Sequence, residues 1–288
     1  MEDYSAFVPN VRFEQIPIKN LVSCQVYQRN LSQSHVKKAA ENFDLHQINP
    51  VKVSRRDGIN YVFNGQHTIE IVALVSGSRE TPVWCMIYDD LEYTAEADIF
   101  ANQMKYVKPL MPYEIFVANV EAGNDKQLII KELVESFNLK VTSSGVPGGI
   151  CAVSSLEFIY DKYGYENLQR TLMLAVGTWE GEPQSLSAGM LKGIAKMVNI
   201  YRDELSDDAF KERLSRVSVK EIVHTAKERQ AGSRGFVEAL LLQYNKKTRY
   251  PLLWEKLYDH NNRHRKDPIP EKGPEPEVDT EDTDNEEE

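Results

Sequence analysis

The chain has 288 residues, of which 41% are hydrophobic and 27% are charged. This length and composition are typical of a globular protein with one large domain or two modest ones, each able to bury a core. No apolar run approaches the ~18–20 residues that span a bilayer, and the amino terminus lacks the basic and apolar regions of a secretion signal. We therefore expect a cytoplasmic protein without a membrane partner.

The net charge of −10 is concentrated at the carboxyl end of the chain. Residues 267–288 contain eleven acidic residues and one lysine, so the rest of the chain is neutral overall. Several prolines and a lack of large apolar residues predict that this acidic tail is disordered. It could serve as a solubilising end, or as a nucleic-acid mimic that competes for a basic surface of the same protein.

The three cysteines lie far apart and form no C-x-x-C pair. An odd, scattered set argues against a disulfide framework and against a structural zinc site, so we predict no metal centre. Cys24, Cys85 and Cys151 are instead expected to be small buried hydrophobic residues.

The amino-terminal region has a mixed pattern of strands and helices. Residues 14–18 alternate in polarity and predict an edge strand. Ser32 or Ser34 can cap a helix that runs to about Asn42. The dipeptide Asp57-Gly58 lies between two alternating runs, 50–54 and 59–63, and predicts a β-hairpin because glycine adopts positive φ readily.

Further along, residues 82–88 are apolar almost throughout and predict a central strand. Thr94 can cap a following helix. From about Met111 the periodicity is helical, with a glycine-rich stretch at 143–149 that we interpret as a flexible connection. The predicted helices cover 113–122, 126–137, 150–163, 165–176, 187–201, 207–216 and 219–230. The expected fold class is α+β, with a small mixed-sheet domain over 1–116, an all-α domain over 117–266 and the tail over 267–288.

The segment 61–68 carries the strongest functional signal. A strand leads into a tight turn, and the turn opens a helix predicted over 68–76. The first N–H groups of a helix lack internal partners and lie at the positive end of its dipole, so they can bind an anion. Gly65 allows close approach to the backbone, while Gln66, His67 and Thr68 offer polar side chains. Taken alone, such a turn is a weak signal.

The order of four motifs makes the signal stronger. They are Tyr27-Gln28-Arg29, the box from Gln47 to Val53, Asn64-Gly65-Gln66-His67-Thr68, and Ala101-Asn102-Gln103-Met104-Lys105. Over roughly residues 14–116 this order resembles the amino-terminal domain of the ParB family, within the ParB/sulfiredoxin-like superfamily. The G-Q-H box is similar to that of ParB-like proteins of bacteria, phages and mobile elements.

The resemblance implies a site for a nucleotide's phosphates, with CTP or ATP and Mg²⁺ as its cofactors. The residues carried over by position are Arg29, Gln47, Gly65, Gln66, His67, Thr68, Asn102 and Lys105. Three departures weaken the site: Asn64 replaces an aspartate, Thr68 an arginine and Ala101 a glutamate. Losing a guanidinium and two carboxylates argues against metal binding and hydrolysis, and no catalytic residue is predicted. Gln66 stands where sulfiredoxin has its nucleophilic cysteine, which excludes sulfinic-acid repair.

Residues 244–266 form a basic segment with interleaved aromatic residues. Basic side chains neutralise phosphates and aromatic faces stack on bases. The candidate DNA-binding residues are Lys246, Lys247, Arg249, Arg263, Arg265 and Lys266. The alternative is an amphipathic terminal helix that docks on the core through Leu252, Leu253 and Leu257. Both interpretations can hold together.

Three functions remain open. The first is a ParB-like DNA-binding or regulatory protein of a phage or bacterial mobile element, in which the amino-terminal domain is a ligand-gated switch for homodimer formation. The second is a ParB-like nuclease or nucleotide-dependent kinase. The third is a non-catalytic protein-interaction module with a degenerate site. The substitutions at 64, 68 and 101 favour the first or the third function.

Overall fold

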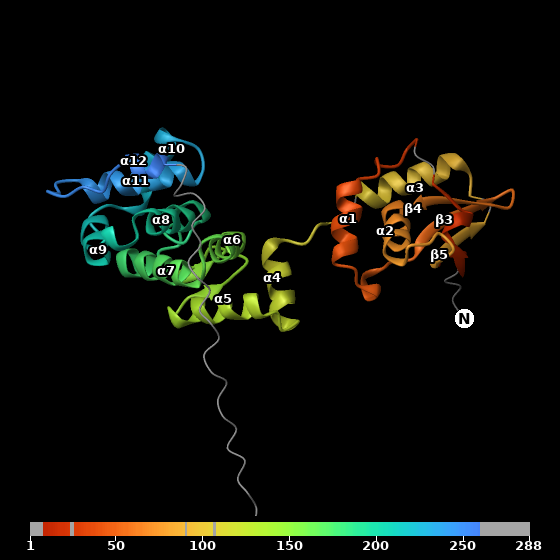
Figure 1. Ribbon diagram of the computed structural model, residues 1–288, viewed down its shortest axis with the longest axis horizontal. Coiled ribbons are helices and arrows are strands. Elements are labelled where there is room, and N and C mark those ends of the chain that lie inside the picture. The colour runs from red at the N-terminus through yellow and green to blue at the C-terminus, as the bar shows by residue number, and fades with distance from the viewer. Residues whose placement is uncertain (1–7, 24–25, 90, 106–107, 260–288) are drawn as a thin grey trace, which may run out of the picture. The chain divides into compact units, whose positions relative to one another are not determined.

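The computed structural model describes residues 8–23, 26–89, 91–105 and 108–259 (Figure 1). The chain divides into two compact units, Met1–Pro109 and Leu110–Glu288. The predicted tail over 267–288 lies outside the described residues. The first unit contains a mixed β-sheet and the second is mostly helical, so the fold class is α+β as predicted.

The sheet of the first unit has five strands in the order β1-β5-β3-β4-β2. The strands are β1 Arg12–Pro17, β2 Leu21–Ser23, β3 Val51–Arg56, β4 Ile59–Asn64 and β5 Pro82–Asp89. Two pairings are antiparallel (β1 with β5, β3 with β4) and two are parallel (β2 with β4, β3 with β5). The predicted edge position of β1 is confirmed.

The β3–β4 hairpin forms where the sequence predicts it. Arg56 pairs with Ile59 across the turn, and Asp57 (φ 51°) and Gly58 (φ 76°) both have left-handed backbone angles. Two consecutive residues with positive φ give the turn the twist that neighbouring strands need. The Asp-Gly dipeptide therefore sets the register of β3 against β4.

Strand β5 is an interior strand, as predicted, but it is not buried on both faces as its nearly continuous apolar sequence suggested. Its side chains alternate between buried and exposed, with Cys85 and Ile87 fully buried and Trp84 54% exposed. The strand is therefore covered fully on one face only, because helix α2 (Gln66–Ser76) packs there and contributes Ile69 to the same core cluster.

Helices α1 (Gln33–Glu41) and α3 (Tyr93–Lys105) complete the first unit. Ser32 caps α1 by accepting a hydrogen bond from the N–H of His35, at 3.3 Å. Helix α3 is anchored by Glu96, which is fully buried, forms an ion pair with Arg56 at 2.8 Å and accepts a hydrogen bond from the Tyr27 hydroxyl at 3.1 Å. A buried carboxylate needs such partners, so this cluster fixes α3 against the hairpin.

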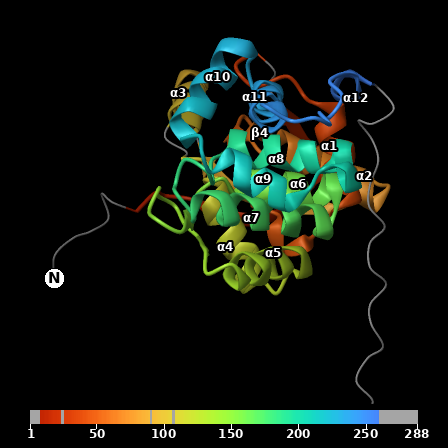
Figure 2. The same ribbon diagram turned by 90° about the vertical axis from the view of Figure 1, so that its left-hand side faces the viewer.

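The second unit contains nine α-helices and a short 3-10 helix, Arg202–Glu204, among the residues described. The α-helices are α4 Pro112–Glu121, α5 Asp125–Ser136, α6 Val153–Tyr163, α7 Tyr165–Trp179, α8 Ala188–Tyr201, α9 Asp207–Leu214, α10 Val219–Arg229, α11 Ser233–Asn245 and α12 Glu255–Tyr258. Helix α8 lies between α7 and α11 in both views (Figures 1 and 2). No described helix is long and apolar enough to cross a membrane.

Two elements of this unit differ from the sequence prediction. Helix α11 was not predicted. Val237 to Leu241 are five consecutive buried residues, so this part of the helix lacks the apolar and polar faces that reveal an amphipathic helix. The glycine-rich stretch 143–149 is not a plain flexible connection: it joins two short parallel strands, β6 (Lys140–Val141) and β7 (Gly149–Ile150).

The cysteines also differ from one another. Cys85 is buried, and burial raises the pKa of its thiol to about 11. Cys151 is exposed, so its predicted burial is wrong. It lies directly after β7, near the surface hydroxyl of Thr142. Cys24 lies outside the described residues.

Candidate functional site

The candidate site begins at the turn between β4 and α2. Strand β4 ends at Asn64, Gly65 has φ +109°, and α2 begins at Gln66, two residues earlier than predicted. A Cβ atom at Gly65 would lie 3.2 Å from the Cα and both Cγ atoms of Val51. The turn therefore requires glycine for its backbone angle and for its close contact with β3.

The first turn of α2 presents polar backbone groups to solvent. The first intrahelical bond runs from the N–H of Ile69 to the carbonyl of Gly65, at 3.1 Å. Gln66, His67 and Thr68 precede it, so their N–H groups have no intrahelical acceptor. Among the described residues, no side chain caps them. Thr68 itself lies inside this first turn.

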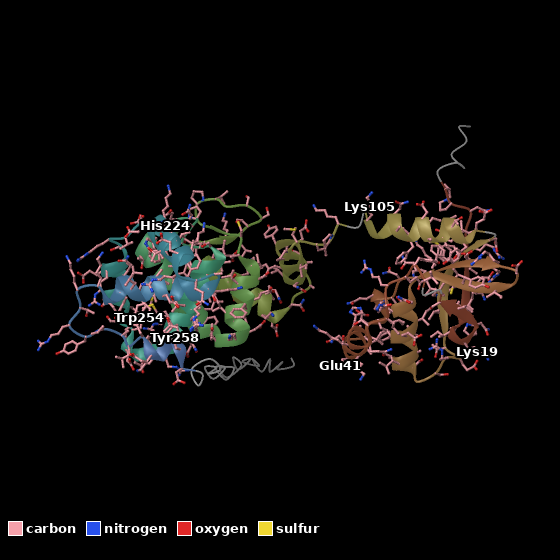
Figure 3. The ribbon with its side chains drawn as sticks, turned by 90° about the horizontal axis from the view of Figure 1, so that it is seen from above. Lys19, Glu41, Lys105, His224, Trp254 and Tyr258 are labelled. Carbon is pink, nitrogen blue, oxygen red and sulfur yellow. The ribbon has the colours of Figure 1, made fainter. Side chains whose placement is uncertain are left out.

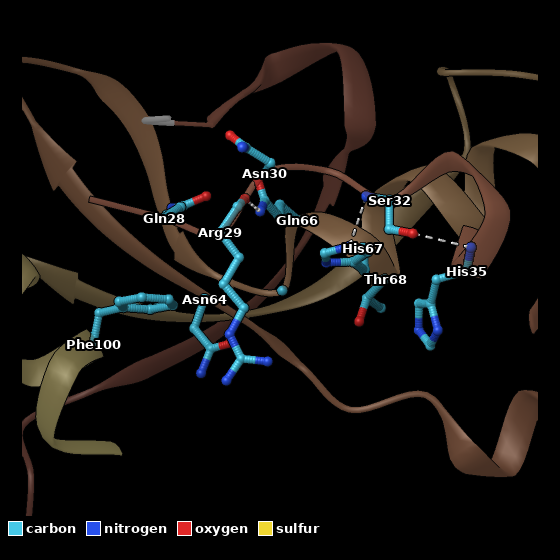
Figure 4. A pocket seen from close by; sticks show the side chains of 11 residues that line it. Gln28, Arg29, Asn30, Ser32, His35, Asn64, Gln66, His67, Thr68 and Phe100 are labelled. Carbon is cyan, nitrogen blue, oxygen red and sulfur yellow. Dashed lines mark hydrogen bonds between the residues drawn. The ribbon is translucent and has the colours of Figure 1, made fainter. Parts of the chain in front are cut away.

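These residues line a cavity of about 440 Å³ (Figure 4). Its described lining residues are Gln28, Arg29, Asn30, Ser32, His35, Asn64, Gly65, Gln66, His67, Thr68 and Phe100. The lining contains one guanidinium and two imidazoles, and no carboxylate. A helix amino terminus, a cation and hydrogen-bond donors without an opposing acid favour an anionic ligand.

Two side chains of the turn hold the wall of the cavity in place. The Gln66 side-chain amide donates a hydrogen bond to the backbone carbonyl of Arg29. The backbone N–H of Ser32 donates to Nε2 of His67, at 3.2 Å (Figure 4). Residues 29–32 are thus tied to the start of α2. In this arrangement Gln66 and His67 shape the cavity, and Arg29 and Thr68 line it beside the first backbone N–H groups of α2.

The hydrogen bond to His67 Nε2 requires a neutral imidazole. Burial is the main cause that lowers the pKa of His67, and the nearby positive charges of His35 and Arg29 lower it further. His35 also packs edge-to-face on His67, with ring centroids 5.4 Å apart. The native state therefore binds a proton at His67 less readily than the unfolded chain does.

We expect this pKa shift to make the first unit less stable in acid. An unfolded histidine titrates near pH 6.5, and the folded pKa of His67 lies lower, so its contribution is complete above about pH 6.5 and is lost as the pH falls through the folded pKa. His67→Gln keeps an acceptor for Ser32 but cannot titrate. Hydrogen exchange of α2 at pH 7.5 and 5.5, corrected for intrinsic rates, should show a smaller loss of protection in this variant than in the wild type.

His46→Gln is the matched control, because His46 is exposed and its side chain has no such acceptor role. This variant should follow the wild type at both pH values. Equal losses of protection in the wild type and in His67→Gln would show that His67 is not the titrating group.

The fourth motif, from Ala101 to Lys105, approaches the turn through Gln103, which was not among the predicted site residues. The Asn64 amide donates to the side-chain oxygen of Gln103, at 3.1 Å. The predicted Asn102 is exposed and pairs with Asp98 on its own helix, at 3.0 Å. Lys105 is exposed at the end of α3 (Figure 3). Neither Asn102 nor Lys105 lines the cavity.

Gln47 lines a second, neighbouring cavity and does not line this one. Its side chain donates to Asp44 at 3.3 Å, and it lines a cavity of about 450 Å³ that shares His35 and Thr68 with the first. The structure thus brings together Arg29, Gly65, Gln66, His67 and Thr68 of the predicted set. The lining residues that were not predicted include Ser32 and Phe100, which reach the turn from distant parts of the sequence.

The residues present do not form a Mg²⁺ site. Mg²⁺ prefers carboxylate oxygens, and the described lining of the cavity has none. Within the described ranges no cluster of three or more metal-ligating residues occurs. The described wall therefore offers the predicted Mg²⁺ no carboxylate ligand.

The predicted basic segment is divided by the structure. Lys246, Lys247 and Arg249 are exposed, whereas Arg263, Arg265 and Lys266 lie outside the described residues. A continuous terminal helix is absent from the described part of the segment, which contains the last two residues of α11 and the four-residue helix α12. Leu252 and Leu257 dock on the core as expected, but Leu253 is 54% exposed.

The matches to known proteins include a solved structure and the model of a family. A crystal structure of the C-terminally truncated chromosome-partitioning protein ParB from Caulobacter crescentus, complexed with CTP-gamma-S, shares 14% sequence identity with this chain. The alignment covers 65% of this chain and 98% of that one, with a TM-score of 0.37. No curated protein matches the chain.

The match to a family model is to one described as a family of unknown function (DUF6551). It extends over residues 22–256, from β2 in the first unit to α12 in the second. The chain therefore belongs to the family of unknown function DUF6551.

Proposed function

We propose that this chain is a ParB-like regulatory protein whose first unit binds a nucleotide by its phosphates. The observation that carries the proposal is the uncapped start of α2, which opens into a cavity lined by Arg29 and by no carboxylate among the described residues. A cavity of about 440 Å³ lies in the size range of small-molecule sites. The motif resemblance to ParB makes CTP and ATP the first candidates.

The arrangement supports binding rather than catalysis. The N–H groups of α2, the Thr68 hydroxyl and the Arg29 guanidinium can hold phosphate oxygens. The described lining offers no carboxylate to activate water as a general base, and the one imidazole nitrogen with a defined partner, His67 Nε2, already accepts a hydrogen bond from Ser32. Binding of the nucleotide is therefore the event that the site would use for regulation.

Isothermal titration calorimetry with CTP, ATP, GTP and inorganic phosphate tests this proposal. We expect at least one nucleotide to bind with similar affinity in Mg²⁺ and in EDTA, since the described wall supplies no carboxylate to a metal ion. Arg29→Gln should weaken binding about tenfold or more, because it removes a charge-assisted hydrogen bond. Arg79→Gln is the control: Arg79 pairs with Glu70, and it does not line the cavity.

The outcome of the titration is decisive. Absence of heat from all four ligands would contradict the proposal, as would binding that Arg29→Gln and Arg79→Gln weaken equally.

A second function, DNA binding by the helical unit, is supported by the exposed basic residues. Lys246 and Lys247 line a cavity of about 430 Å³ together with Arg213 and Arg216. In the described part of the chain, neither lysine has a carboxylate partner. If they bind DNA phosphates, the logarithm of the affinity should fall linearly with the logarithm of the salt concentration, and Lys246→Gln/Lys247→Gln should lower that slope by about 2.

A further inference from the structure

A separate basic cavity lies in the helical unit, between α6, α8 and the start of α11. Its volume is about 430 Å³. The charged residues in its described lining are Lys162, Lys192, Lys196, Arg234 and Asp259. None of these lysines or arginines belongs to the basic segment that the sequence pointed to.

Two of the lysines surround one exposed aromatic ring. The Lys162 Nζ atom lies 5.2 Å from the ring centroid of Phe158, and the Lys192 Nζ atom lies 4.8 Å from the same centroid. Phe158 is 40% exposed. Both lysines are half-buried, and neither has a carboxylate partner among the described residues. The Lys162 Nζ atom also lies 5.4 Å from the ring centroid of Tyr163. Two half-buried ammonium groups therefore line the cavity beside aromatic rings, whose quadrupoles attract cations.

The nearby carboxylates of Asp161 and Glu238 pair with residues other than Lys162 and Lys192. Asp161, next to Lys162 in sequence, pairs with Lys126 at 3.0 Å. Glu238 lies 3.8 Å from Arg229 and 3.7 Å from Arg234, and accepts a hydrogen bond from the Tyr258 hydroxyl. Among the residues that the structure describes, Asp259 is the one acidic residue in the cavity lining. The wall therefore retains an excess of positive charge, which favours a phosphate-bearing ligand.

We propose that this cavity binds a single-stranded segment of nucleic acid. Phosphates would contact Lys162 and Lys192, and an unpaired base would pack against Phe158. A groove that combines cations with an aromatic face is the arrangement that binds unpaired strands, because every base can stack while its phosphates are neutralised. A base held in a duplex has no free face to offer. The site is in the second unit and does not depend on nucleotide binding by the first.

Fluorescence anisotropy tests the proposal with the full chain and a labelled strand of about 16 nucleotides. The expected order of affinity is single strand above duplex of the same sequence. Lys162→Gln and Lys192→Gln should each weaken single-strand binding roughly fivefold at low salt and lower the salt slope by about 1. Phe158→Leu keeps an apolar side chain and should weaken it at least about fivefold, with little change in the slope.

Lys131→Gln is the matched control, because Lys131 is paired with Glu135 on the exposed face of α5. It should bind the strand like the wild type, and Arg29→Gln should too, so failure of the nucleotide site leaves this test intact. Inorganic phosphate and a mononucleotide serve as competitors. Tighter binding of the duplex, loss in Lys131→Gln equal to that in Lys162→Gln, or displacement of the strand by equal concentrations of mononucleotide would overturn the proposal.

Discussion

Gly65→Ala is expected to destabilise the first unit by about 2–3 kcal/mol and to abolish nucleotide binding. A non-glycine residue with strongly positive φ is strained by about 1–3 kcal/mol, and here the added methyl group also meets three Val51 atoms at 3.2 Å. Val51 is fully buried in the sheet, so it has no room to move away. The start of α2 must shift instead, and the N–H groups that face the cavity shift with it.

Gly77→Ala separates the backbone strain from the contact with Val51. Gly77 ends the same helix with φ +69°, and a Cβ there would meet nothing within 4 Å. It should cost about 1 kcal/mol and leave nucleotide binding unchanged. Hydrogen exchange of the peptides covering β4 and α2 gives the local stability of each variant. Equal losses in Gly65→Ala and Gly77→Ala would show that the contact with Val51 contributes nothing.

Gly235→Ala should have the largest effect on the helical unit, about 3 kcal/mol. A Cβ at Gly235 would lie 2.1 Å from the carbonyl oxygen of Gln230 and 2.3 Å from that of Ala226. Both are backbone atoms at the end of α10, so α10 and α11 would have to separate, which is the costly extreme of overpacking. Thermal unfolding followed by circular dichroism should show a midpoint lower by roughly 6–12 °C.

Gly177→Ala provides the control for the helical unit. Gly177 lies within α7, and its closest neighbour would be the Cε atom of Lys211 at 2.9 Å, the far end of a flexible side chain. Because alanine favours a helix by up to about 1 kcal/mol over glycine, this variant should be neutral or slightly stabilising. A midpoint for Gly235→Ala close to that of Gly177→Ala would contradict the packing argument.

The parts of the fold that sequence predicted well are those with local causes. The Asp57-Gly58 turn and the Ser32 cap need only neighbouring residues, and both occur as expected. The glycine turn before α2 was also found, because a strand end, a glycine and a helix start follow one another directly. The convergence of residues 28–32 on that turn was not predictable in detail, since it depends on tertiary hydrogen bonds between residues far apart in the chain.

Two further errors of the sequence prediction concern helices: the residue that α3 presents to the turn, and the existence of α11. The motif resemblance predicted Asn102 as a site residue, but it is Gln103 of α3 that bonds to Asn64. A shift of one residue turns a helical side chain by about 100°, so a motif match does not fix which neighbour faces the site. Helix α11 was missed because its buried run carries no polar stripe, and an amphipathic pattern is the signal that reveals a helix.

In the basic segment, hydrogen bonds from one side chain prevent the terminal helix that the composition suggested. At the end of α11 the Asn245 side chain donates to the carbonyl of Leu252 and accepts from its N–H, at 2.8 and 2.9 Å. This pair closes a loop that contains Pro251, so the chain cannot continue as the amphipathic helix that its charges and leucines suggested. Leu253 consequently points away from the core.

Hydrogen exchange with and without nucleotide tests the central claim most directly. If the uncapped start of α2 binds phosphates, saturating nucleotide should slow exchange at residues 64–70 and in the 28–35 segment that forms the opposite wall, while α4 to α12 remain unchanged. Arg29→Gln should remove this protection at the same nucleotide concentration. Protection confined to other segments, or none at a concentration where calorimetry shows binding, would contradict the assignment of the site.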